Sequence, residues 1–404
     1  MFDKPHESAE LKEVKGLEFW SWEQDGIRKL ELTGKGSYSD PEVEKQFKGK
    51  FVTEEDLALI IREDTDVYGP KGILDMFSTE DNWEERLIVS FRKGAIPEET
   101  SRTAYENLKG GAESTDNRGT ASGPVDFKKL PQFMFKYGDP VFKGNGRNRA
   151  FQVLEDGSIS KTSRANFVNS GQCGFFGPNM RFPYARRAGH SKSNPEKVEK
   201  ATPYFERVSE VFKTLAPKVW QRQYDFLKKH NLVENGWTLG SSVYTTITIN
   251  KNFQTACHQD AGDYSGGLGN ITVLENPDKP FAGGYVCFPQ WRCGVDLREG
   301  DILVFAIHQY HGNTKILPPE GVPEFDEEGE ETFERMSLVC YARENMKNAG
   351  TKEEEELKYN AWRSKFVSSA KQSVLNQKQL KADVLKANEE LEEMIGMLED
   401  NGED

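Results

Sequence analysis

The fold of this chain is decided by the stretch Ser242-Val243-Tyr244-Thr245-Thr246-Ile247-Thr248-Ile249-Asn250, which precedes His258-Gln259-Asp260. A run so rich in β-branched residues is typical of a strand. Two more apolar runs, residues 283–288 and 300–305, are each bounded by a turn signal. Strands at this spacing, with no long helices between them, indicate a barrel or a sandwich.

The His-x-Asp motif carries metal-ligand chemistry. In an extended strand, side chains i and i+2 point the same way, so His258 and Asp260 can bind one ion. A second histidine is available in Tyr310-His311-Gly312-Asn313. Two imidazoles and one carboxylate on one face of an octahedral ion leave positions open for a co-substrate and oxygen, as in non-haem Fe(II) oxygenases. The pattern therefore favours iron over zinc.

Two histidines compete for the third ligand position, His308 and His311. We favour His311, because it opens a run in which His311, Asn313 and Lys315 share one face. His308 lies nearer the preceding strand, where a loop is expected, and would instead support the ligands or face the substrate.

A strand is also expected at residues 335–341, with Arg335, Ser337, Val339 and Tyr341 on one face. A charged residue in such a strand needs a partner. One interpretation is a structural ion pair. The other is a fork for a dicarboxylate co-substrate, since a guanidinium binds a carboxylate through two hydrogen bonds and Ser337 can add a hydroxyl. Arg343 is the fallback, because the acidic run before Arg335 makes the assignment by spacing less secure.

The order of these motifs resembles the 2-oxoglutarate/Fe(II) dioxygenases, which have a double-stranded β-helix. The flanking residues resemble more narrowly the TET and J-binding-protein family, especially its bacteriophage branch. The segments that carry this resemblance are residues 117–123, 170–176, 246–250, 255–264, 308–314 and 337–346. The resemblance spans residues 85–347 and is most specific over residues 242–346.

The resemblance implies roles for the motif residues. His258, Asp260 and His311 would be the catalytic Fe(II) ligands, and Arg335 with Ser337 would bind the distal carboxylate of 2-oxoglutarate. With O2, the enzyme would oxidise the 5-methyl group of 5-methylcytosine or thymine in DNA to the hydroxymethyl base, and the resemblance favours 5-methylcytosine. The target base must leave the stack to reach the metal. Two alternatives remain: a 2-oxoglutarate hydroxylase of a protein side chain or small molecule, and a non-catalytic module that binds modified DNA.

The net charge of −13 at first argues against a DNA partner. However, residues 316–334 carry eight acids and no base, and residues 351–404 carry thirteen acids against eight bases, so these two segments account for the whole excess. Residues 143–197 hold ten Lys and Arg against three acids, interleaved with aromatic residues. This pattern predicts a DNA-binding surface with Arg181, Arg186, Arg187 and Lys192, although an ordinary solvated face would look the same.

We predict an α+β protein: a double-stranded β-helix (jelly-roll) core buttressed by helices, followed by a charged C-terminal helix. The predicted parts are a mixed N-terminal extension (1–84), a dioxygenase domain (85–347, core 242–346, acidic insert 316–334) and a C-terminal helical segment (348–404). Within them, residues 53–63 look helical, and residues 203–230 predict helices separated at Pro217. Residues 380–398 have coiled-coil spacing, which favours packing within the chain and could also mediate self-association.

The five cysteines show no paired spacing, which indicates buried thiols in a reducing compartment. The sequence has no apolar run of membrane length and no secretory h-region, so we expect no membrane partner. We therefore expect a soluble intracellular protein, located in the host cytoplasm if a phage encodes it.

Overall fold

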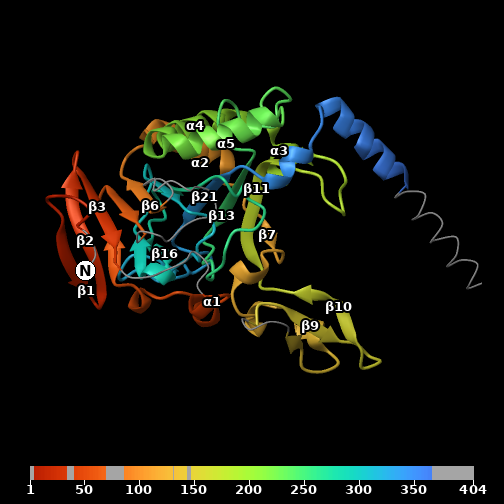
Figure 1. The fold of residues 1–404 in the computed structure, drawn as a ribbon. Coiled ribbons are helices and arrows are strands. Elements are labelled where there is room, and N and C mark those ends of the chain that lie inside the picture. The colour runs from red at the N-terminus through yellow and green to blue at the C-terminus, as the bar shows by residue number, and fades with distance from the viewer. Residues whose placement is uncertain (1–3, 34–40, 70–85, 131, 143–146, 366–404) are drawn as a thin grey trace, which may run out of the picture. The chain divides into compact units, whose positions relative to one another are not determined.

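The computed structural model describes residues 4–33, 41–69, 86–130, 132–142 and 147–365, and the chain forms two compact units. The first unit comprises Met1–Gly177 and Arg186–Asn348, and the second comprises Pro178–Ala185 and Ala349–Asp404. Each unit is described by itself below (Figure 1).

A long sheet forms the first unit's main layer. Its strands run in the order β1 (Glu10–Val14), β2 (Leu17–Gln24), β3 (Ile27–Leu32), β5 (Thr65–Tyr68), β6 (Leu87–Arg92), β18 (Ile302–Phe305), β14 (Gly269–Glu275), β21 (Arg335–Tyr341), β13 (Thr246–Lys251), β11 (Val168–Phe176) and β12 (Arg186–Arg187). β7 (Ser114–Thr115) also pairs with β11. Neighbouring strands are antiparallel, except for the parallel pair β3 and β5. Residues on both sides of position 84 thus share one sheet, and the domain boundaries we proposed from the sequence stay predictions.

A smaller sheet supplies the second layer of the jelly-roll. It contains β19 (Gly312–Asn313), β16 (Val286–Phe288), β17 (Cys293–Val295) and β4 (Leu59–Ile61). Apolar side chains from both sheets form one core; Val273 and Phe305 come from the large sheet, and Val286 and Phe288 from the small one. Two further sheets are peripheral: β15 (Ala282–Gly283) with β20 (Ile316–Leu317), and β8 (Val141–Phe142), β9 (Ala150–Val153) and β10 (Ile159–Arg164).

Helices cover the large sheet (Figure 1). α2 (Glu98–Leu108) and α4 (Pro195–Leu215) pack together and contact β14 and β18, and α5 (Pro217–Lys229) packs on α4. The two helices predicted within residues 203–230 are confirmed, with the second beginning at Pro217. Proline suits the first position of a helix, because its missing N–H would have no partner there. Two shorter helices are α1 (Pro41–Phe47) and α3 (Gly189–Ser193).

Some predicted elements differ from the structure. Residues 53–63 were expected to be helical, but Glu54–Asp56 forms one 3-10 turn and β4 follows it. The acids of this stretch cap and solvate the turn, while Leu59–Ile61 pairs with β17. β13 begins at Thr246, four residues after Ser242. The strand predicted at residues 335–341 is confirmed as β21.

In the second unit, the described residues form one helix over 352–365 and a cluster of aromatic rings. Tyr184, Tyr359 and Trp362 lie within 6.4 Å of one another by ring centroids. The backbone N–H of Ala185 donates a hydrogen bond to the carboxylate of Glu355. The predicted coiled-coil segment 380–398 lies outside the described residues.

The prediction of buried thiols is confirmed: all five cysteines are free and buried. Among the described helices, none is both long and apolar enough to cross a bilayer. In the acidic insert, residues 320–330 are exposed.

A buried ion cluster links the N-terminal strands to β6. Asp66 on β5, with a side chain 4% exposed, accepts hydrogen bonds from Arg92, Ser90 and Lys29. Burial alone would raise the pKa of Asp66, but Arg92 and Lys29 hold it below its ordinary value. The ionised carboxylate therefore stabilises the fold above the unfolded-state pKa, and this contribution is lost as the pH falls through the lower folded-state pKa.

Asp66→Ala is expected to destabilise the protein by about 3–5 kcal/mol at neutral pH, because it leaves two largely covered cations, Arg92 and Lys29, without the carboxylate that pairs with them. Urea unfolding measures this loss. Glu63→Ala is the matched control: it removes an exposed ion pair with Arg28, whose contribution should be at most about 1 kcal/mol. Equal losses in the two variants would contradict the role given to Asp66.

Candidate metal centre and adjoining cavity

The predicted ligand motifs meet where two chain segments pair. The backbone N–H of His258 donates to the carbonyl of His311 at 2.8 Å, and the reverse bond is 2.9 Å. Asn313 Oδ1 accepts from the backbone N–H and the hydroxyl of Thr255, at 2.8 and 2.6 Å. A Cβ at Gly312 would lie 2.8 Å from the Thr255 carbonyl oxygen, so only glycine allows this approach. These contacts bring segments far apart in sequence into register.

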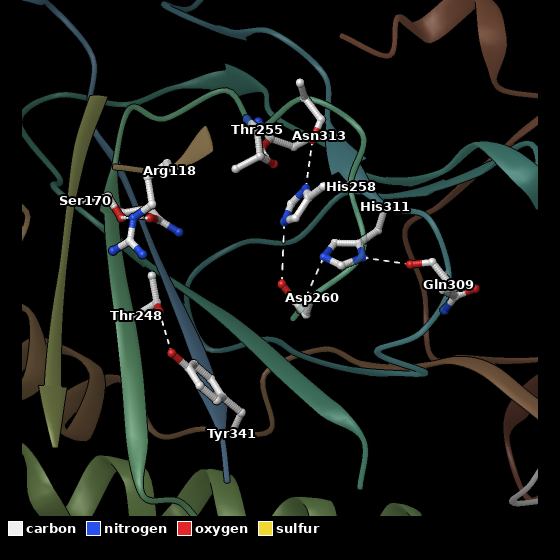
Figure 2. Close-up of polar contacts among 12 residues, drawn as sticks. Arg118, Ser170, Thr248, Thr255, His258, Asp260, Gln309, His311, Asn313 and Tyr341 are labelled. Carbon is white, nitrogen blue, oxygen red and sulfur yellow. Dashed lines mark hydrogen bonds and ion pairs between the residues drawn. The ribbon is translucent and has the colours of Figure 1, made fainter. Parts of the chain in front are cut away.

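His258, Asp260 and His311 form a compact cluster whose ligand atoms lie within 4.8 Å of one another (Figure 2). Asp260 Oδ1 is 3.5 Å from His258 Nε2, and its Oδ2 is 3.4 Å from His311 Nε2. Each Nδ1 instead faces a backbone carbonyl, that of Ala256 at 2.8 Å and that of Gln309 at 3.0 Å. A proton on Nδ1 leaves the Nε2 lone pairs directed at a shared position.

Charge coupling within the cluster favours an ionised carboxylate. Burial alone would raise the pKa of Asp260, but the imidazoles of His311 and His258 hold it well below its ordinary value. Burial would lower the pKa of His311, but Asp260 raises it. A divalent cation at the shared position would take over the role of these protons, since metal ligands must be deprotonated.

The competing histidine lies outside this cluster. His308 Nε2 is 3.2 Å from the carbonyl oxygen of Ser265, and its ring belongs to none of the metal-like groups among the described residues. Cys257, next to His258 in sequence, packs in a separate apolar cluster with Tyr310. Burial raises the pKa of its thiol to about 12.

The cluster opens into a cavity of about 190 Å³ that is also lined by β21. The four residues predicted to share a face of this strand, Arg335, Ser337, Val339 and Tyr341, all line it. Arg335 is 3% exposed, and its Nε and Nη2 contact no acceptor among the described residues. Burial and the nearby Arg298 lower the pKa of Arg335 to about 10. A buried guanidinium without a carboxylate partner is the donor set that an anionic ligand would satisfy.

Gly284 leaves room for this guanidinium. Its φ is +68°, and a Cβ there would lie 3.0 Å from Arg335 Cδ and 3.1 Å from Nε. A side chain at this position would strain the backbone and crowd the arginine.

Three more charged residues line the cavity: Arg118, Asp263 and Arg343. Arg118 Nε donates to Ser170 Oγ at 2.8 Å (Figure 2), and Arg343 Nη2 donates to the Tyr341 hydroxyl at 3.0 Å. Burial and the neighbouring Asp260 raise the pKa of Asp263. The sequence placed Arg118 and Asp263 only in flanking segments and gave them no role. The only sequence feature that could have pointed to Arg118 and Asp263 is that each is a charged residue within a segment that carries the family resemblance.

The residues predicted to bind DNA belong to both units. Arg181 belongs to the second unit, whereas Arg186, Arg187 and Lys192 belong to the first. Arg186 stacks on the Phe176 ring at 4.9 Å and is half-buried, while Arg187 and Lys192 are exposed. Sequence clustering alone could not show that Arg186 packs on an aromatic ring.

A jelly-roll core with a His-Asp-His cluster beside a buried arginine is the arrangement of the 2-oxoglutarate/Fe(II) oxygenases. Residues 178–344 match the model of the Tet_JBP family, described as the oxygenase domain of the 2OGFeDO superfamily. Over these residues the chain carries this family's oxygenase domain, as the motif flanks predicted. Enzymes of this superfamily use Fe(II), 2-oxoglutarate and O2.

Several curated proteins are similar to the chain. It is 29% identical over 158 residues to the bifunctional helicase and thymine dioxygenase JBP2 of Leishmania tarentolae, covering 39% of this chain and 13% of that protein. It is 30% identical over 289 residues to the thymine dioxygenase JBP1 of Leishmania major, covering 68% of this chain and 32% of that protein. The chain thus spans a third or less of these two relatives.

Among solved structures, NgTET1 in complex with 5mC DNA matches with a TM-score of 0.41 and 12% identity. The match covers 75% of this chain and 86% of the other.

Proposed function

We propose that this protein oxidises the 5-methyl group of a pyrimidine base in DNA, with Fe(II), 2-oxoglutarate and O2. One observation carries the proposal: the His258, Asp260 and His311 cluster lines the same cavity as the Arg335 guanidinium, whose Nε and Nη2 contact no acceptor among the described residues. This pairing of a metal-ligand set with an anion-binding group matches the needs of a metal-bound dicarboxylate.

The donor sets fit the groups that the family uses. His258 Nε2, His311 Nε2 and a carboxylate oxygen of Asp260 would hold Fe(II) on one face, and Arg335 with Ser337 would hold the distal carboxylate of 2-oxoglutarate. When bound, these groups supply the oxidising chemistry: 2-oxoglutarate and O2 yield succinate, CO2 and one oxygen atom for the methyl group.

The chain's own residues position and shield this chemistry. The carbonyls of Ala256 and Gln309 hold the two imidazole rings in orientation. The Phe281 ring lies 5.8 Å from the Arg335 guanidinium, which is 3% exposed, so an apolar side chain covers one side of this cation. A base in a stacked duplex cannot reach so enclosed a site, and we therefore propose that the target nucleotide is flipped or single-stranded.

The target base is either thymine or 5-methylcytosine. The relatives named thymine dioxygenases support thymine, and the family resemblance favours 5-methylcytosine. The two bases differ at position 4, which is an acceptor oxygen in thymine and an amino donor in 5-methylcytosine. We further propose that Arg187 and Lys192, both exposed, contribute to DNA binding together with Arg181 and Arg186.

DNA that contains both thymine and 5-methylcytosine is expected to gain one oxygen atom on one of these bases after incubation with Fe(II), ascorbate and 2-oxoglutarate. Mass spectrometry of the released nucleosides detects the product and identifies the substrate in one experiment. His258→Ala is the control and should give no product, because one of three metal ligands is missing.

Succinate release without an oxidised base would overturn the DNA proposal. It would favour the alternative, a 2-oxoglutarate hydroxylase of a protein side chain or small molecule. DNA binding without succinate release in the wild-type protein would instead favour a non-catalytic module.

A further inference from the structure

A second, larger hollow lies beside the metal cavity in the first unit. We call it the α5 groove: about 880 Å³, lined by residues within 217–230 and by Tyr264, Glu344 and Lys347. None of the motifs that define the metal site uses the residues of α5, so the proposed chemistry leaves this groove unexplained.

One layer of paired backbone separates the groove from the metal cavity. Asp263 and Arg343 form an antiparallel bridge, flanked by hydrogen bonds from Tyr264 N–H to the Ala342 carbonyl at 2.8 Å and from Glu344 N–H to the Gly262 carbonyl at 3.0 Å. Successive side chains of extended backbone point to opposite faces. Asp263 and Arg343 accordingly line the metal cavity, while Tyr264 and Glu344 line the groove.

The α5 groove is lined by more cationic than acidic residues, although the whole chain has a net charge of −13. Its cationic lining residues are Lys218, Arg222, Lys229 and Lys347, joined by His230. Both of its acids already have partners: Asp225 accepts from Gln221 Nε2 at 2.8 Å, and Glu344 pairs with Lys347 at 2.7 Å. Lys229 is exposed and forms no ion pair among the described residues.

Aromatic rings form part of its lining. Phe226 and Tyr264 stack with ring centroids 4.1 Å apart and planes 15° apart, and His230 lies 5.1 Å from Phe226. Arg222 Nε donates to the carbonyl of Gly266 at 2.7 Å, and this hydrogen bond holds the guanidinium in place. A groove that combines cations with aromatic rings is typical of surfaces that bind a nucleic-acid strand, because the cations contact its phosphates and the rings contact its bases or sugars.

We propose that the α5 groove binds the phosphate backbone of the DNA strand that carries the target nucleotide. This inference rests on the proposed function, since it takes the target to be a base in DNA. A flipped base in the metal cavity and its flanking phosphates in the groove would lie on the two sides of the 262–264 and 342–344 backbone pair. The groove therefore supplies phosphate contacts that position the strand without reading its sequence.

The test compares two triple variants that each remove three positive charges. The groove variant is Lys218→Gln, Lys229→Gln and Lys347→Gln. The control variant is Lys12→Gln, Lys93→Gln and Lys109→Gln, three exposed lysines that line neither the groove nor the metal cavity. Fluorescence anisotropy of a labelled single-stranded oligonucleotide containing 5-methylcytosine and thymine is recorded over a series of KCl concentrations.

The groove variant is expected to bind roughly tenfold more weakly at low salt, with a slope of log affinity against log salt that is smaller by about 2. The control variant should keep the wild-type slope. Thermal melting checks that both variants are folded. If the triple groove variant does not fold, Lys229→Gln alone replaces it, and this single variant should lower the slope by about 0.7.

Equal slopes in the groove and control variants, or a wild-type protein with no salt-dependent binding, would overturn the inference. Base oxidation is read separately by mass spectrometry. Groove-dependent binding without an oxidised base would refute the proposed function and leave the groove as a DNA site.

Discussion

His311→Ala is expected to weaken Fe(II) binding by at least roughly 100-fold and to reduce product formation below detection. The variant removes one of three ligand atoms that lie within 4.8 Å of one another. It also leaves Asp260 beside a single imidazole. Loss of a residue that merely orients a ligand typically costs 10–100-fold in metal affinity, so loss of a ligand should exceed that range. Anaerobic calorimetry with Fe(II) alone measures the affinity, and succinate release measures turnover.

His308→Ala is the matched control for this prediction. This variant also removes an imidazole, three positions earlier in the sequence. The ring of His308 contacts the Ser265 carbonyl and lies outside the metal-ligand cluster. Metal affinity should stay within a few-fold of wild type. A His308→Ala variant that loses the metal, beside a His311→Ala variant that keeps it, would reverse the assignment of the third ligand.

Local pattern was sufficient to predict the parts of the site that depend on one strand. The alternation in residues 335–341 placed Arg335, Ser337, Val339 and Tyr341 on one face, and β21 presents all four to the cavity. The i and i+2 spacing of His258 and Asp260 had the same basis, although the structure shows an isolated bridge to His311 there and no regular strand. A two-residue period survives in any extended backbone.

The rest of the site depends on contacts between distant segments, which no local pattern encodes. Arg118 reaches the cavity because its guanidinium is bonded to Ser170 on β11. Asp263 and Arg343 meet through a backbone bridge, which joins the segment that follows Asp260 to the residues just after β21. The helical prediction for residues 53–63 failed for a related reason: pairing with β17 outweighed the local helix propensity.

Arg335→Met is expected to raise the KM for 2-oxoglutarate by at least roughly 100-fold. A guanidinium can form two charge-assisted hydrogen bonds to one carboxylate, each contributing about 1.5–3 kcal/mol, and a thioether forms neither. Arg335→Lys should fall between wild type and Arg335→Met, because the ammonium keeps the charge but lacks the planar fork. Initial rates of succinate release over a range of 2-oxoglutarate concentrations give these values.

The stability of the same variants separates the two roles that the sequence left open for Arg335. A structural ion pair would make Arg335→Met strongly destabilising, by about 3–5 kcal/mol, since a buried carboxylate would lose its partner. No carboxylate is paired with Arg335 among the described residues, and two of its N–H groups have no acceptor. Arg335→Met should therefore leave the ligand-free protein as stable as wild type or more stable.

The response to 2-oxoglutarate is the second measurement. In wild type, 2-oxoglutarate at 100 times its Kd should add about 2.7 kcal/mol of stability in the presence of Fe(II) without oxygen, and Arg335→Met should lose this gain at the same concentration. A variant that melts early without ligand yet keeps its response to 2-oxoglutarate would assign Arg335 to the fold instead of the co-substrate.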